Sequence, residues 1–343
     1  MKTLNLDNII TMKHSHILLF FLFLHWCEAG ISQNRQYDLD KTIHVGDALG
    51  WDYTAVDEVN QNIYFSHGIK VLVCSAKNDA VIAEIPNTTG VHGIAFDHAL
   101  NKGFISNGKA NSVMAFDLTT FKVLDTVAVT GTNPDAILYD PYSKKIIAFN
   151  GKSANATVID PSTVKVVATI SLPGKPEFGV TDSKGNIYVN IEDQSKIVQL
   201  DANDLTVKKS WSVAPGEEPS GLALDSKNNI LFSVCANKKM IVFDLVTEKV
   251  ISVIEIGGGV DAVVFDPETK LIYSSNGEGN VTIVKQISPA SYQTVQVLQT
   301  QKGCKTMAMD GKTKKIYLAA AQFEGNTRKI LDGSFNILVY KQR

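Results

Sequence analysis

Apolar and polar residues alternate along most of the chain in short runs that are separated by polar turns. This period-two alternation is typical of half-buried β-strands, whereas an amphipathic helix repeats its apolar positions every third or fourth residue. The stretches 137–139 and 222–224 illustrate one kind of predicted strand, and 187–189 and 316–318 illustrate a second. The pattern predicts an all-β protein and excludes a helical solenoid.

The predicted strands recur with a period of about 42 residues. An aspartate closes the first strand of every unit, at Asp57, Asp97, Asp140, Asp182, Asp225, Asp266 and Asp310. A third strand ends at a further aspartate in four units, at Asp117, Asp160, Asp201 and Asp244. A fourth strand, such as 165–170 or 249–254, precedes a turn rich in Gly and Pro. Four short antiparallel strands per unit are typical of a propeller blade, so the sequence predicts a seven-bladed β-propeller.

The two ends of the chain predict how the ring closes. The seventh unit reaches the C-terminus without a fourth strand, and 41–46 has the pattern of the missing one. We therefore expect the N-terminal strand to pair with the last blade. The longer segments 287–301 and 321–334 interrupt units six and seven, and we expect them to form loops over one face.

A stretch in the middle of the chain resembles a known family. Residues 150–190, with 155–160, 165–170, the turn containing Gly174 and Pro176, and 187–190, resemble the repeats of YVTN-type (YncE-like) propellers. The resemblance implies an exported seven-bladed propeller. Related propellers include lactonases, streptogramin-lyase-like enzymes and binding scaffolds, and a shared fold does not choose among them.

Residues 1–32 have the pattern of a secretory signal peptide. Lys13 precedes an apolar run at 17–24, and cleavage is expected after Ala29, Gly30 or Ser32. The run is too short to cross a bilayer, which takes roughly 20 apolar residues. We expect cleavage to leave a single propeller domain, residues 33–343, that is secreted or periplasmic and monomeric.

Other features of the N-terminal segment bear on the same prediction. Met12 is an alternative start, because the residues before it add nothing that a signal requires. His25 and Trp26, rather than small residues, precede Cys27, so we expect no lipid anchor. Three cysteines would remain in an oxidising compartment. We expect Cys74 and Cys235 to be buried thiols, and Cys304 is either a third buried thiol or a reactive one.

Composition narrows the classes of function. Hydrophobic residues make up 44% and charged residues 20% of the chain, which excludes disorder over most of its length. The 33 basic and 35 acidic residues nearly balance, whereas nucleic-acid binders show a basic excess. Nucleic-acid binding is therefore a minor alternative. The chain has no G-x-S-x-G, H-E-x-x-H or paired C-x-x-C motif.

Chemistry in a propeller is expected where equivalent positions converge on the central channel. The residue five positions before each strand-closing aspartate should lie at one level of that channel, and these residues are Asp52, His92, Asp135, Glu177, Ser220, Asp261 and Lys305. Converging carboxylates repel one another unless a proton or a cation lies between them. One interpretation is a divalent cation held by Asp52, Asp135, Glu177 and Asp261, with His92 added for a transition metal. The other is a hydrated polar mouth without a ligand.

A second set of candidates follows the second strand of several units, at His67, Asn107, Asn150, Asn190 and Asn276. Asn followed by Gly is an ordinary hairpin dipeptide, so a turn is the simpler interpretation for Asn107, Asn150 and Asn276. His67 departs from that pattern. We expect it to approach His92 near the channel, as a metal or an acid–base pair requires.

Two principal functions follow from the sequence. The first is an exported binding or scaffold protein, without enzymatic activity, that holds a small molecule, peptide or protein through one face. The second is a metal-dependent hydrolase or lyase, lactonase-like or streptogramin-lyase-like, with its site at the channel mouth. A divalent cation is the one cofactor that these residues suggest.

Overall fold

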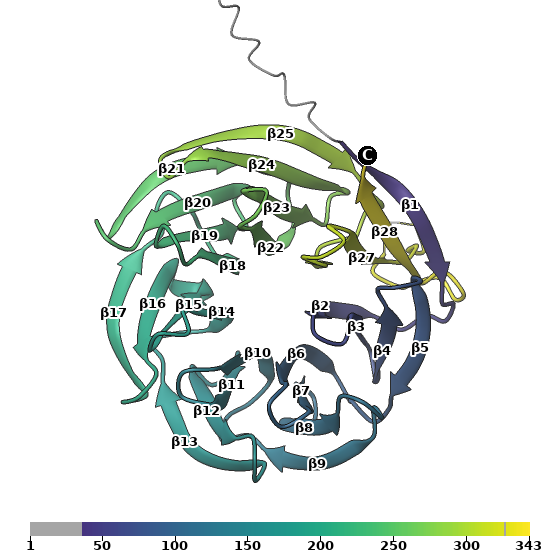
Figure 1. The fold of residues 1–343 in the computed structure, drawn as a ribbon, viewed down its shortest axis with the longest axis horizontal. Helices are drawn as coiled ribbons and strands as arrows, with labels where there is room; N and C mark the ends of the chain where they lie inside the picture. Colours follow the sequence, from purple (N-terminus) through teal and green to yellow (C-terminus); the bar gives the residue numbers. More distant parts are fainter. Residues whose placement is uncertain (1–35, 326) are drawn as a thin grey trace, which may run out of the picture. The chain divides into compact units, whose positions relative to one another are not determined.

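A computed structural model describes residues 36–343 except residue 326, and the predicted signal peptide lies outside this part of the chain. The described residues form a ring of seven four-stranded antiparallel blades (Figure 1), which confirms the predicted fold. Blades 1 to 3 contain β2 (Trp51–Asp57), β3 (Asn62–His67), β4 (Lys70–Ser75), β5 (Ala80–Ile85); β6 (Val91–Asp97), β7 (Lys102–Asn107), β8 (Ser112–Asp117), β9 (Val123–Ala128); and β10 (Pro134–Asp140), β11 (Lys145–Asn150), β12 (Asn155–Asp160), β13 (Lys165–Ser171).

Blades 4 to 7 complete the ring. They contain β14 (Pro176–Thr181), β15 (Asn186–Ile191), β16 (Lys196–Asp201), β17 (Thr206–Ser212); β18 (Pro219–Asp225), β19 (Ile230–Cys235), β20 (Lys239–Asp244), β21 (Lys249–Glu255); β22 (Val260–Asp266), β23 (Leu271–Asn276), β24 (Asn280–Ser288), β25 (Ser291–Gln299); and β26 (Met307–Met309), β27 (Ile316–Ala320), β28 (Asn336–Gln342), β1 (Tyr37–His44). A single 3₁₀ turn, η1 (Glu192–Gln194), follows β15 within the described chain.

The N-terminal strand closes the ring, as predicted. β1 pairs antiparallel with β28, from Tyr37 opposite Gln342 to His44 opposite Asn336, as the outermost strand of blade 7. A buried carboxylate joins this blade to blade 1, because Asp79 accepts hydrogen bonds from Lys315 Nζ at 2.6 Å and from the Tyr317 hydroxyl at 2.9 Å. Strand pairing and side-chain contacts therefore both fasten the last blade to the first.

The repeating aspartates shape the turns between strands. In the first turn of blade 1, an Asp57 carboxylate oxygen accepts hydrogen bonds from the backbone amides of Val59 and Asn60, and Gln61 adopts a left-handed conformation. Blades 2 and 5 repeat this arrangement with Asp97 and Asp225. An aspartate that caps backbone amides favours a tight turn, which explains why it marks the repeat.

The apolar core is divided among the contacts between blades. Seven clusters of buried side chains each join two neighbouring blades, and the cluster between blades 3 and 4 also contains Tyr53 of blade 1. Tyr64 of blade 1, for example, packs with Phe96 and Phe116 of blade 2. The second strands are almost wholly buried, whereas outer strands such as β9 are exposed. The stability of the ring therefore comes from apolar contacts between successive blades.

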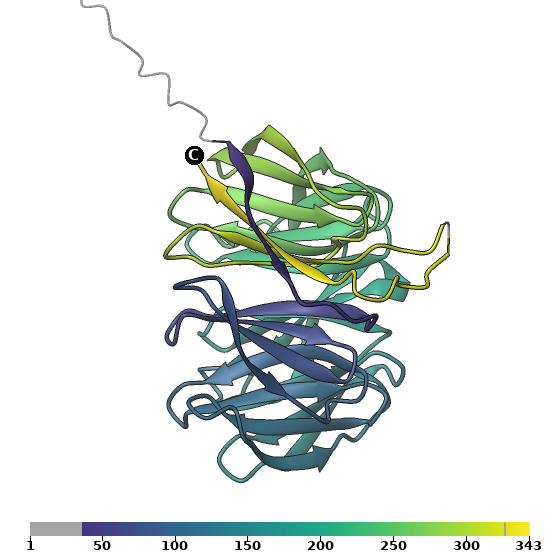
Figure 2. The ribbon, with the colours of Figure 1, turned by 90° about the vertical axis from the view of Figure 1, so that its right-hand side faces the viewer.

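The two long segments behave differently. The segment 287–301, predicted to be a loop, instead forms the end of β24 and all of β25, so that prediction is wrong for this segment. Tyr292, Val295 and Leu298 pack against the core and hold it in the sheet. The segment 321–334 does connect β27 to β28 as a loop that extends from one face (Figure 2). No helix of the described chain has the length and apolar character needed to cross a bilayer.

Candidate ligand site at the channel mouth

All seven channel positions line a single cavity of about 340 Å³. The channel residues lie near the start of the first strand of each blade, which in an antiparallel sheet lies beside the end of the second strand. The 321–334 loop follows β27, the second strand of blade 7. The cavity therefore opens on the face that carries this loop. Lys175, Glu192 and Glu218 join the wall from loops on this face. The cavity thus presents six carboxylates, two lysines and one histidine.

An irregularity in the strand pairing exposes the channel residues. In six blades the ladder between the first and second strands is interrupted at the channel position, for example between Trp51 and Thr54 or between Val91 and Ile94. Such bulges redirect side chains and are common beside functional sites. Asp52 and His92 are therefore free of the regular pleat and face the axis.

Hydrogen bonds between blades hold the channel backbone. The carbonyl oxygens of Asp52 and Asp135 accept hydrogen bonds from the hydroxyls of Thr306, at 2.6 Å, and Ser106, at 2.5 Å. Ser66 donates to the carbonyl of His92, and the carbonyls of Ser220 and Lys305 receive equivalent bonds from Asn190 and Ser275. Each donor belongs to the preceding blade, so one blade positions the channel residue of the next.

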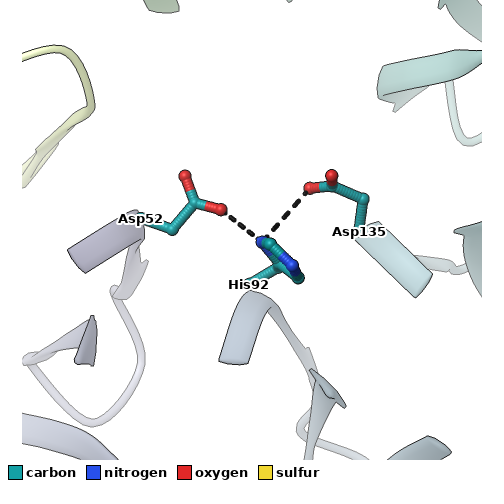
Figure 3. A group of neighbouring side chains, drawn as sticks. All are labelled: Asp52, His92 and Asp135. Carbon is teal, nitrogen blue, oxygen red and sulfur yellow. Dashed lines mark hydrogen bonds and ion pairs between the residues drawn. The ribbon is translucent and has the colours of Figure 1, made fainter. Parts of the chain in front are cut away.

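The charged side chains form two separate networks of ionic contacts. His92 Nδ1 lies 2.5 Å from an Asp52 oxygen and 3.7 Å from an Asp135 oxygen (Figure 3). Lys305 Nζ lies 3.3 Å from the other Asp52 oxygen and 2.5 Å from Asp261. On the opposite wall, Lys175 Nζ lies 2.7 Å from Glu177 and also contacts Glu192.

These surroundings shift the protonation of the site. Burial, strengthened by repulsion from Asp52 and Asp261, raises the pKa of Asp135 to about 6. Burial and the charge of Asp135 raise the pKa of Glu177 to about 8, although Lys175 opposes the change. Burial would raise the pKa of Asp52, but His92 and Lys305 outweigh it and the pKa falls. Near neutral pH a proton therefore remains on the Asp135–Glu177 side of the cavity, and it relieves the repulsion between carboxylates that a cation would otherwise relieve.

The polar cavity has an aromatic floor. Tyr53 of blade 1 reaches across the axis to Phe178 of blade 4, with ring centroids 5.6 Å apart. Tyr53 also lines a separate, mainly apolar cavity of about 190 Å³, together with Leu222, Val264 and Met309. The site is thus a polar well above an apolar chamber.

The second set of predicted residues does not line the well. His67 is fully buried, its Nε2 lies 2.8 Å from Asp47, and its ring stacks on Phe335 at 3.9 Å. The expected approach of His67 to His92 is wrong, because His67 faces the contact between blades 1 and 7. Asn190 faces blade 5, where its amide also donates to Gly221 O at 3.0 Å.

The remaining asparagines act inside their own blades. Asn150 Nδ2 donates to Asn155 and Thr157, and Asn276 Nδ2 repeats this pattern with Asn280 and Thr282. A turn does follow each of Asn107, Asn150 and Asn276, but its left-handed residue is Asn111, Ala154 or Gly279 rather than the glycine after the asparagine.

Asn107 is buried like its counterparts, but neither polar atom of its amide has a hydrogen-bond partner in the described chain. Its blade carries Met114 where blade 3 carries Thr157. The threonine hydroxyl that accepts from Asn150 Nδ2 therefore has no counterpart in blade 2.

Several wall residues were not anticipated from the sequence. Lys175, Glu192 and Glu218 belong to loops outside the repeated strands, and Tyr53 enters only because its side chain crosses the axis. Cys304 does not join them: burial raises the pKa of its thiol to about 12, and Cys74, Cys235 and Cys304 are all buried and unpaired.

Comparisons of the chain with protein-family models and with curated proteins find no match. Of the features that the YVTN-type resemblance implies, the structure supports the seven-bladed fold.

Proposed function

We propose that the protein is a non-enzymatic binding protein whose channel-mouth cavity takes a positively charged ligand, either a small molecule or a basic side chain of a peptide or protein. The observation that carries the proposal is the convergence of six carboxylates, with only two lysines and one histidine, on one cavity of about 340 Å³. Excess negative charge in a concave, partly buried wall attracts cations and raises their local concentration.

A diamine and its neutral analogue test this function. The full chain is titrated calorimetrically with 1,4-diaminobutane and, as a control for size, with 1,4-butanediol. The proposal predicts saturable binding of the diamine alone, with weaker binding in Glu192→Gln, which removes a carboxylate from the cavity wall. Glu255→Gln removes the same charge from an exposed position at the end of β21 and should leave binding unchanged. Equal responses to diamine and diol, or equal effects of the two variants, would refute the proposal.

A metal-dependent hydrolase or lyase is the second candidate. One observation favours it: a ligand atom from each of Asp52, His92 and Asp135 lies within 4.8 Å of the others. Three protein ligands with an open position are typical of catalytic metal sites. This candidate predicts lactone hydrolysis or elimination that is lost in chelator and restored by metal, and an unchanged rate in chelator would exclude it.

The proposal also includes export and membership of the YVTN-type group. It is supported by the signal-like residues 1–32 and by the repeat pattern of 150–190. Expression of the full chain in a secreting host, followed by mass spectrometry of the released protein, should give an N-terminus after Ala29, Gly30 or Ser32. Leu19→Asp, which interrupts the apolar run, should abolish release. Release with an intact N-terminus would contradict the proposed signal.

A further inference from the structure

We infer that Asp52, His92 and Asp135 form a binding site for a divalent transition-metal ion at the channel mouth. The inference rests on the proposed function, because the excess negative charge that attracts a cationic ligand to the cavity also attracts a metal ion. Three features support it: the arrangement of the donor atoms, the hydrogen bonds that hold their backbone, and a tyrosine hydroxyl beside them that has no partner within the described chain.

The donor atoms already face a common point. Both close contacts of His92 are made by Nδ1, which lies between Asp52 Oδ2 at 2.5 Å and Asp135 Oδ1 at 3.7 Å (Figure 3). Metal–ligand bonds of about 2.0–2.2 Å place pairs of donors roughly 3–3.5 Å apart. The ion would take the place of the hydrogen between His92 and Asp52, and His92 would release its Nδ1 proton to solvent and keep a proton on Nε2.

The donor set selects the class of ion. Two carboxylates balance a divalent charge, and a neutral imidazole favours transition metals over Ca²⁺ and Mg²⁺, which prefer oxygen ligands. The two oxygens of Asp52 have separate partners, because Oδ1 faces Lys305 at 3.3 Å while Oδ2 faces His92. Lys305 thereby orients Asp52 without itself binding the ion.

The backbone of the three residues is held in place before any ion binds. Asp52, His92 and Asp135 come from three successive blades, and the carbonyl of each accepts a hydrogen bond from a hydroxyl of the preceding blade. Glu177 and Asp261, the other two carboxylates at this level, have no such bond within the described chain. Ser220 and Lys305 receive similar bonds, so among the four carboxylates and the histidine at this level the three proposed ligands are the ones whose backbone is held in this way.

Tyr53 gives an independent indication of a ligand. The residue is only 8% exposed and lines the same cavity. Its hydroxyl makes no hydrogen bond within the described chain, although Asp52, Asp135, Glu177 and Asp261 line the same cavity. The hydroxyl oxygen is not fully enclosed by protein, so a partner in the cavity can reach it. A water that completes the coordination of the ion would supply one.

Cobalt is the probe for this site, because its visible absorption reports nitrogen and oxygen coordination. The full chain is first dialysed against EDTA and then titrated with Co²⁺, Ca²⁺ and Mg²⁺ in parallel. We expect one Co²⁺ per chain, displacement by Zn²⁺, and much weaker binding of Ca²⁺ and Mg²⁺. Asp135→Asn should weaken Co²⁺ binding by about 10- to 100-fold, and His92→Gln should change the absorption spectrum of any residual complex.

Glu218→Gln is the matched control, because it removes one carboxylate from the same cavity wall without touching the three ligands. The loss of one screened charge from the cavity wall should change the affinity for Co²⁺ by no more than about threefold. Melting curves verify that each variant is folded. If Asp135→Asn does not fold, His92→Gln replaces it as the test variant.

Three results would overturn the inference: equal affinity for Ca²⁺ and Co²⁺, equal effects of Asp135→Asn and Glu218→Gln, or no metal binding at all. If the wild type binds 1,4-diaminobutane but no metal, the metal site fails and the proposed function stands. If it binds neither, both fail.

Discussion

A substitution at Gly108, which lies against the imidazole ring of His92, tests the metal site without changing any charge. A methyl group built on Gly108 would lie 2.5 Å from His92 Nε2 and 2.6 Å from Cδ2. Ordinary carbon contacts begin near 3.4 Å, so Gly108→Ala would displace the imidazole by about 0.9 Å. Gly108 does not have a left-handed φ, so alanine causes no backbone strain there.

The expected consequence is a loss of affinity without a loss of fold. Asp52 and Asp135 are held by their carbonyl hydrogen bonds, so a displaced imidazole no longer matches them. We expect Co²⁺ affinity to fall by about 10- to 100-fold, which corresponds to about 1.4–2.7 kcal/mol. The melting temperature should stay within a few degrees of the wild type.

Gly151→Ala is the matched control, because Gly151 occupies the same place in blade 3. Its added methyl would meet nothing closer than 3.7 Å, with Asp135 Oδ2 at 3.9 Å. Cobalt titrations followed by visible absorption compare the two variants. Equal affinities for Gly108→Ala and Gly151→Ala, with both proteins folded, would refute the role given to His92.

Three further predictions concern stability. Folding raises the pKa of Glu177 from 4.5 to about 8, so its protonation stabilises the folded state below pH 4.5, and that stability is lost as the pH rises through 8. This loss is at most about 5 kcal/mol, and urea titrations should show a smaller pH dependence in Glu177→Gln, whereas identical profiles would contradict the assigned shift. Ser106→Ala removes the donor to the Asp135 carbonyl, which should cost about 1–3 kcal/mol and weaken Co²⁺ binding; Ser291→Ala, on the exposed start of β25, should do neither. Asp79→Ala leaves the buried Tyr317 hydroxyl without its acceptor and should cost about 1–3 kcal/mol in urea; a change below about 0.5 kcal/mol would show that this contact does not secure the ring.

The features predicted from the sequence are those that recur in every blade. Asp57 and its equivalents mark the turns because in each unit the aspartate accepts a hydrogen bond from at least one backbone amide of the turn that follows. A fixed offset from those aspartates locates the seven channel residues because each blade enters the ring in the same orientation. Periodicity was sufficient for these features, since they depend on local geometry that the fold repeats.

The features that escaped prediction depend on contacts between blades. Tyr53 becomes the floor of the site only because Phe178 lies across the axis from it. The position before the loop carries Asn107, Asn150 and Asn276, but a threonine two residues into the next strand accepts from the Nδ2 of Asn150 and of Asn276 only. Lys175 lies outside the strands, so no repeat assigns it a place in the wall.

Anomalous diffraction tests the central claim most directly. Crystals of the full-length or secreted protein grown with Co²⁺, measured at the cobalt absorption edge, should show one peak in the channel-mouth cavity. We predict that it lies within about 2.0–2.3 Å of Asp52 Oδ2, His92 Nδ1 and Asp135 Oδ1. Peaks confined to the outer surface, or an empty cavity at saturating cobalt, would contradict the account.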